Sequence, residues 1–153
     1  MRIDRDEWLL QMAELVALRG TCSRYQVGVV IAREGRVLAT GYNGAPAGLP
    51  HCEHECTCTP NDQFGVHAAD CEARPGCTVA VHAEANAIAY AARLGIALEG
   101  ASLYCSLSPC VACAQLIINA GVRRVFFRSC YRITDALALF DEVAIEYKQL
   151  ELE

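Results

Sequence analysis

Residues 102–128 read SLYCSLSPCVACAQLIINAGVRRVFFR, and this stretch places one helix-like run between two strand-like runs. The flanking runs, 102–107 and 122–128, are typical of strands. Between them, Ser108 and the proline that follows it are typical of a helix start, with Ser as the N-cap and Pro in the first turn. Gly121 predicts the end of that helix. The order strand, helix, strand is typical of α/β proteins, in which helices pack against a sheet.

The segments on either side continue this alternation of helices and strands. An Asp-x-x-Glu capping box at residues 4–7 precedes the first apolar helical pattern. The further expected elements are an opening helix at about 5–19, hairpin strands at 27–32 and 36–40, helices at 82–94 and 134–141, and a short edge strand or tail at 143–147. We therefore expect one mixed sheet with helices packed against it.

Length and composition indicate one compact, soluble unit. The chain has 153 residues, of which 54% are apolar, so we expect a single domain over 1–153 with a well-filled core. It has no apolar run long enough to span a bilayer and no signal-peptide core, which predicts a cytoplasmic protein. Thirteen Lys and Arg against eighteen Asp and Glu give a net charge of −5. This charge disfavours binding to long nucleic acid but leaves room for a small anionic ligand.

Cysteine usage points to metal. Ten cysteines in a chain without an export signal are more typical of metal binding than of disulfides. Residues 51–77 form a Cys- and His-rich insertion without apolar periodicity, and a loop of this length needs its own tether. Cys105 and Cys130, on or beside predicted strands, are expected to be packing residues.

The strongest chemical signal is a His-x-Glu motif at His82, followed later in the chain by Cys-x-x-Cys at Cys110 and Cys113. Cysteines three apart at a helix start share one face, and the helix N-terminus favours their thiolate forms. One imidazole and two thiolates balance the charge of Zn²⁺ and leave a fourth position for water. The motifs predict an open, catalytic zinc site held by His82, Cys110 and Cys113.

Glu84 is the carboxylate that an activated water requires, because the proton that the water loses must be carried to the substrate. On a regular helix, positions two apart lie about 200° from each other. His82 and Glu84 therefore converge only if the metal lies beyond the first turn of their helix. Each motif also has a simpler interpretation: Cys-x-x-Cys can be a redox pair, and a lone His can be a core residue. A redox pair leaves the His-x-Glu motif unexplained.

With these motifs, the chain resembles the cytidine deaminase superfamily, and within it the deoxycytidylate (dCMP) deaminases. H-x-E followed by P-C-x-x-C is the signature of zinc deaminases. The resemblance covers nearly the whole chain, and the segment 41–48, GYNGAPAG, narrows it to the dCMP branch. It implies a three-layer α/β/α cytidine-deaminase-like fold with a central mixed sheet of about five strands.

The resemblance also implies an activity, which is hydrolytic deamination of dCMP to dUMP in pyrimidine deoxynucleotide metabolism. It implies a catalytic zinc held by His82, Cys110 and Cys113, with Glu84 as the proton shuttle. Asn43 falls where the family contacts the sugar and base, and Arg24 falls where a cation near the 5′-phosphate is useful. Homo-oligomers, often hexamers, and regulation by dCTP and dTTP are further implications. A solvated surface Arg and a plain turn Asn are the simpler interpretations of these two positions.

A second, structural zinc is also implied, since some dCMP deaminases carry one with ligands that match Cys22 and Cys52. The family's other ligands are not cleanly matched here. We favour Cys71 and Cys77 as the remaining ligands, with Cys56 as the leading substitute and Cys58 as a further candidate. The alternative is a set of reduced, free thiols.

Two other functions stay open at this point. The same fold also serves deaminases of other cytosine nucleosides or nucleotides and of adenosine in tRNA, although the net charge disfavours tRNA. A non-enzymatic alternative is a zinc-stapled binding module with an inert site. The presence of Glu84 argues against that alternative, because a purely structural zinc site has no need of a carboxylate beside an open position.

Overall fold

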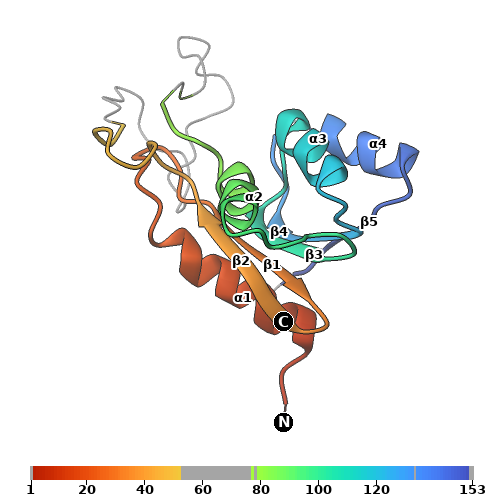
Figure 1. The fold of residues 1–153 in the computed structure, drawn as a ribbon. Helices are drawn as coiled ribbons and strands as arrows, with labels where there is room; N and C mark the ends of the chain where they lie inside the picture. Colours follow the sequence, from red (N-terminus) through yellow and green to blue (C-terminus); the bar gives the residue numbers. More distant parts are fainter. Residues whose placement is uncertain (1, 53–76, 78, 133, 152–153) are drawn as a thin grey trace.

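The computed structural model describes residues 2–52, 77, 79–132 and 134–151 (Figure 1). The named elements are α1 (Arg5–Ala17), β1 (Gly28–Arg33), β2 (Arg36–Tyr42), α2 (Ala83–Arg93), β3 (Ser102–Leu107), α3 (Val111–Asn119), β4 (Arg124–Ser129), α4 (Asp135–Glu142) and β5 (Glu146–Gln149). Among the described helices, none has both the length and the apolar character that crossing a bilayer requires.

The five strands form one mixed sheet in the order β2-β1-β3-β4-β5. β1 pairs antiparallel with β2 and with β3, whereas β3, β4 and β5 run parallel to one another. α1 covers one face of the sheet, and α2, α3 and α4 cover the other (Figure 1). The predicted three-layer α/β/α fold with five mixed strands is therefore confirmed.

Alternation along the strands divides the core into two halves. Val29, Ile31 and Leu103 point toward α2, α3 and α4, whereas Val30 and Tyr104 point toward α1. Successive side chains of a strand face opposite sides, so a sheet covered on both faces needs nearly continuous apolar strands. Each of these fully buried aliphatic side chains contributes about 1.5–3 kcal/mol to folding.

The last strand begins later than predicted. β5 starts at Glu146 rather than at Val143, because the chain first turns through Ala144, which has a φ of 56°. Ile145 is then buried in the core. Cys105 is fully buried, as predicted. The prediction for Cys130 is wrong, because this residue lies beyond the end of β4 and its side chain is exposed.

A buried arginine joins β4 to α1 and to the C-terminal segment. The Arg128 guanidinium donates to Glu7 at 2.6 Å and 3.1 Å, to Glu14 at 2.8 Å and 3.3 Å, and to the Leu150 carbonyl at 2.8 Å. Its side chain is only 9% exposed. This forked arrangement uses most of the guanidinium donors and ties α1 to the sheet.

Replacing Arg128 with Met is therefore expected to lower the free energy of unfolding by about 3 kcal/mol at neutral pH, because the two carboxylates lose their partner. The hydrogen bonds from Arg128 lower the pKa of Glu7 below its ordinary 4.5. The stabilisation is thus full above pH 4.5 and disappears as the pH falls through the lowered pKa. Urea denaturation at a series of pH values measures both effects.

The matched control is Arg123→Met, which breaks the exposed Arg123–Glu99 pair. An exposed pair contributes about 0–1 kcal/mol, so this variant should denature almost like the wild type. An equal loss in both variants, or a loss in Arg128→Met that grows toward acid pH, contradicts the assigned role.

Candidate active site

Two helix N-termini meet at the edge of the sheet where β3 ends. His82 is the N-cap of α2, and Cys110 is the N-cap of α3. The prediction that Ser108 caps this helix is wrong. The helix starts only at Val111, and the Ser108 hydroxyl instead accepts a hydrogen bond of 2.6 Å from the Tyr131 amide. The N-cap is consequently the first cysteine of the Cys-x-x-Cys motif.

The imidazole and the two thiols converge. His82 Nδ1 lies 3.4 Å from the Sγ atoms of both Cys110 and Cys113. In a tetrahedral zinc site with ordinary bond lengths, a nitrogen and a sulfur ligand lie about 3.6 Å apart. His82 is exposed, Cys110 is half-buried and Cys113 is buried, so the cluster opens to solvent on its histidine side. These three donors fit a zinc ion with one coordination position left open.

Glu84 lies on the buried side of the same cluster. It is only 4% exposed, and burial raises the pKa of its carboxyl group. A hydrogen bond with Cys113 and the charge of His82 also act on the pKa of Glu84, so all three groups lie close together. A carboxyl group held in this way is suited to accept and return a proton.

The two thiols titrate as a pair. Hydrogen bonds from Cys113 and His82 lower the pKa of Cys110 to about 3. The hydrogen bond with Cys110 in turn raises the pKa of Cys113, and burial raises it further. The hydrogen bond to Cys110 also raises the pKa of His82. Without a metal, the two thiols thus have opposite pKa shifts. A divalent cation removes this opposition, because its charge stabilises both thiolates and a neutral imidazole.

Asn43 lies in the loop that follows β2, close to the start of α2. Its Nδ2 donates to the Tyr25 carbonyl at 2.8 Å, and its Oδ1 accepts from the Val27 amide at 2.8 Å. With 7% of its surface exposed, Asn43 shapes the loop that precedes β1. Arg24 belongs to that same loop and is half-buried.

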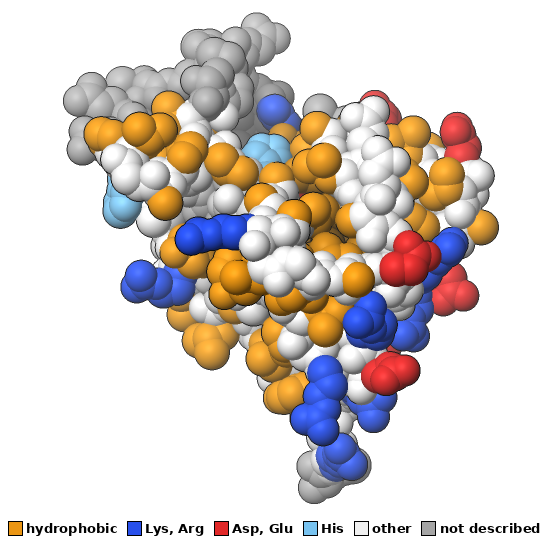
Figure 2. Space-filling view, viewed as in Figure 1, with side chains coloured by type: hydrophobic (Ala, Val, Ile, Leu, Met, Phe, Trp, Pro, Cys, Tyr) orange, Lys and Arg blue, Asp and Glu red, His pale blue; other side chains and the backbone are white. Residues whose placement is uncertain are grey.

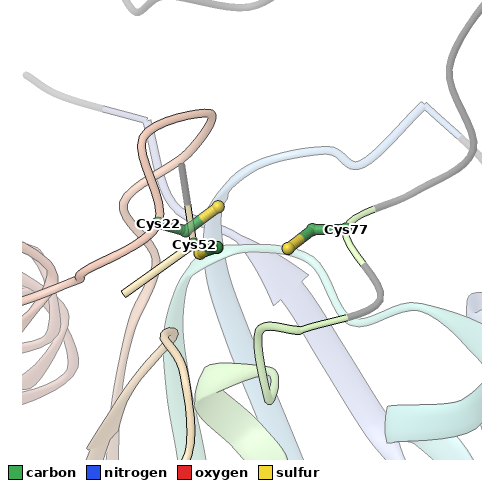
Figure 3. Close-up of side chains that lie close together, drawn as sticks. All are labelled: Cys22, Cys52 and Cys77. Atoms are coloured by element: carbon green, nitrogen blue, oxygen red, sulfur yellow. The ribbon is translucent and has the colours of Figure 1, made fainter. Parts of the chain in front are cut away.

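A second cluster consists of thiols alone (Figure 3). Cys22 follows α1, Cys52 lies in the segment after β2, and Cys77 precedes α2, yet their Sγ atoms lie within 4.8 Å of one another. Burial raises the pKa of Cys52 to about 11. Burial also raises the pKa of Cys77, but hydrogen bonds from the Ala80 and Val79 amides outweigh it and lower that pKa. We call these three residues the thiol cluster.

Three cysteines considered for the thiol cluster are not part of the described chain. Cys56, Cys58 and Cys71 lie outside the described residues. The structure therefore brings together three of the four cysteines favoured from the sequence, namely Cys22, Cys52 and Cys77. In a tetrahedral zinc site two thiolate sulfurs lie about 3.8 Å apart, so this arrangement fits a zinc ion.

No motif in the sequence points to Asn86, whose Nδ2 donates to the Tyr42 carbonyl at 2.8 Å. Asn86 lies in the first turns of α2, four residues after His82. Its signal in the sequence is weak, because an isolated Asn in a helix is usually a solvated residue.

The sequence and the fold both match known proteins. The family model described as "Cytidine and deoxycytidylate deaminase zinc-binding region" matches residues 3–129. Deoxycytidylate deaminase of Mycobacterium phage D29 is 44% identical over 128 residues, which cover 82% of this chain and 95% of that protein. ComE operon protein 2 of Bacillus subtilis is 33% identical over 153 residues, which cover 99% of this chain and 74% of that protein.

A solved structure agrees with these matches. The dCMP deaminase of cyanophage S-TIM5, in complex with dCMP and dUMP, superposes with a TM-score of 0.78 at 29% identity, and covers 98% of this chain and 99% of that one. The family match covers His82, Glu84, Cys110 and Cys113. The chain therefore belongs to the zinc-binding cytidine and deoxycytidylate deaminase family.

Proposed function

We propose that this protein catalyses the zinc-dependent hydrolysis of dCMP to dUMP and ammonia. The observation that carries the proposal is the buried carboxyl group of Glu84 beside three converging zinc ligands, with His82 Nδ1 lying 3.4 Å from each sulfur. A relative that is 44% identical is a deoxycytidylate deaminase, which supports dCMP as the substrate.

His82, Cys110 and Cys113 would hold the catalytic zinc. When bound, zinc supplies Lewis-acid activation of water near neutral pH. Glu84 takes one proton from the attacking water as the new C–O bond forms at C4 of the cytosine ring, and delivers it to N3. Glu84 then carries the second proton of the water to the amino group, and the C4–N bond breaks. One water is consumed and one ammonia leaves, so atoms and charge balance.

Two loop residues complete the proposed substrate site. Arg24 offers a planar guanidinium suited to bidentate contact with the 5′-phosphate. Asn43 reaches the same region of the chain, since its amide holds the Tyr25 carbonyl next to Arg24. We propose that Asn43 contacts the sugar and base with the donor and acceptor capacity that its loop bonds leave over.

An ammonia-release assay with dCMP, deoxycytidine, dCTP and cytidine tests the substrate assignment. We expect dCMP to be the preferred substrate, because the nucleosides lack the phosphate that Arg24 would bind. Equal rates with dCMP and deoxycytidine remove the phosphate contact from the proposal. Release from none of the four leaves the inert binding module as the better interpretation.

We propose a second, structural zinc at the thiol cluster. The thiol cluster draws on three separate segments outside the helices and strands, which contain Cys22, Cys52 and Cys77. A common ion would connect these segments, which the sheet does not hold together. Three thiolates suit zinc, and Cys71, outside the described residues, stays our predicted fourth ligand. The negative charges of three neighbouring thiolates are tolerated only when the metal is bound. Metal binding at this site is therefore coupled to folding.

Replacing Cys52 with Ser is expected to remove one zinc per chain and to lower the melting temperature by about 10 °C, because a structural zinc contributes several kcal/mol to folding. Zinc analysis by mass spectrometry and calorimetry measure these two quantities. Cys130→Ser is the matched control, since Cys130 is exposed and outside both clusters. Unchanged zinc content in Cys52→Ser contradicts the second site.

We also propose that the protein acts as a homo-oligomer, a hexamer as the resemblance implies, with dCTP and dTTP as effectors. Figure 2 shows apolar side chains exposed on one face of the molecule. Tyr90 in α2 is 49% exposed, and Leu94, the C-cap of α2, is 54% exposed. A solvent-exposed apolar helix face is typical of subunit contacts. Light scattering with and without each nucleotide measures the assembly.

A further inference from the structure

The end of β2 lies unusually close to the first turn of α2. A Cβ placed on Gly41 would lie 2.6 Å from the Ala87 amide nitrogen, 2.9 Å from the Ala87 Cβ, and closer still to the Ala83 carbonyl oxygen. Ala83, Ala87 and Ala91 are all fully buried, and their small side chains let the helix approach the strand closely. Only glycine at position 41 permits this separation between helix and strand.

Hydrogen bonds join the same two segments. Asn86 Nδ2 donates to the Tyr42 carbonyl at 2.8 Å. The Gly44 amide donates to the Val81 carbonyl at 3.1 Å, and the Val81 amide donates to the Gly44 carbonyl at 2.8 Å. Residues 41–44 thus contact the chain immediately before and after His82. We call this set of contacts the β2–α2 clamp.

We propose that Gly41 is a positioning residue for the active site, because the β2–α2 clamp sets where His82 and Glu84 lie relative to the thiols of α3. This inference rests on the proposed function. His82 and Glu84 lie at the N-terminus of α2, whereas Cys110 and Cys113 lie at the N-terminus of α3. The two halves of the site therefore depend on how each helix is seated on the sheet.

The strand is the firmer partner in this contact. Gly41 pairs with Val29 in the antiparallel ladder, and Val29 is fully buried in the core. A methyl group at position 41 therefore displaces the first turn of α2 rather than the strand. Ordinary contact of a Cβ begins at 3.4 Å, so the turn has to retreat by about 1 Å. A displacement of about 1 Å at a catalytic group can cost about 100-fold in rate.

Gly41→Ala is therefore expected to lower kcat for dCMP about 100-fold with little change in KM. Hydrogen exchange should become faster in the peptide that covers the first turn of α2 and stay unchanged in α3. Gly28→Ala is the matched control, because a Cβ there meets the Ala13 carbonyl and the Ala17 amide of α1 on the opposite face. The control should speed exchange in α1 and leave kcat, per folded molecule, within about twofold.

A second variant tests the β2–α2 clamp in case Gly41→Ala does not fold. It removes the hydrogen bond between Asn86 and the Tyr42 carbonyl without adding volume. Asn86→Ala is expected to lower kcat about 10-fold and to speed exchange in the same turn of α2. Gln149→Ala is its control, because Gln149 Nε2 also donates to a main-chain carbonyl, that of Arg128, at 3.0 Å but in β5. This control should leave kcat and the exchange of α2 unchanged.

Three results overturn the positioning role. They are wild-type kcat in folded Gly41→Ala, equal losses of kcat in Gly41→Ala and Gly28→Ala, or unchanged α2 exchange in both Gly41→Ala and Asn86→Ala. Failure of the proposed function is distinct, because it is seen as the absence of turnover in the wild type. The exchange measurement then still tests the β2–α2 clamp by itself.

Discussion

Glu84→Gln is expected to lower the turnover of dCMP by about 1,000-fold while both the fold and the zinc content stay at the wild-type level. General acid–base catalysis by a positioned side chain contributes about 10²–10⁴ in rate, and Glu84 handles both proton transfers of the proposed reaction. Glutamine keeps the shape and volume of the side chain but cannot carry a proton. Ammonia release and zinc per chain, measured on the same sample, separate loss of chemistry from loss of metal.

Glu99→Gln is the control for this variant. Glu99 pairs with Arg123 at an exposed position outside the site, with 71% of its side chain accessible. The control also removes one carboxylate from the chain. It should retain full turnover, because that carboxylate lies outside the site. Normal deamination by Glu84→Gln contradicts the assignment of Glu84 as the proton shuttle.

Cys110→Ala is expected to lose one zinc per chain and to reduce turnover to the background rate. Two of the three converging donors are thiolates, and an imidazole with one thiolate is a poor zinc site. The variant also leaves His82 and Cys113 without the partner that lies within hydrogen-bond distance of both. Zinc analysis, ammonia release and circular dichroism check these three outcomes.

The zinc counts of Cys110→Ala and Cys52→Ser together distinguish the two sites. Each variant should lose one zinc and keep the other, and the double variant should lose both. Cys130→Ser should keep both, since its thiol lies outside the two clusters. Full turnover by Cys110→Ala contradicts the catalytic zinc, whatever the zinc count is.

The strand and helix order was predictable because it depends on local pattern. Residues 102–128 carry their own apolar runs and a clear end signal at Gly121, and the predicted strand at 102–107 is confirmed to the residue. The helix start was misplaced, because the usual preference for Ser as an N-cap yields to the hydrogen bond between Ser108 and the Tyr131 amide. That contact joins residues 23 positions apart and has no local signal.

Cysteine chemistry was predictable to a similar degree. Cys110 and Cys113 share one helix turn, so their spacing alone indicates a common ligand. Which cysteine joins Cys22 and Cys52 had no such spacing to guide it. The structure places Cys77 there, on the segment that leads into His82.

By itself, the sequence determined the order of the elements and the kinds of donor atom available to a metal, because strand and helix patterns and the Cys-x-x-Cys spacing act over a few neighbouring residues. Only the tertiary structure decided that Gly41 lies against the first turn of α2 and that Cys77 lies beside Cys22 and Cys52. Such contacts depend on the path of the whole chain, since they join segments whose separation in the sequence carries no periodic signal.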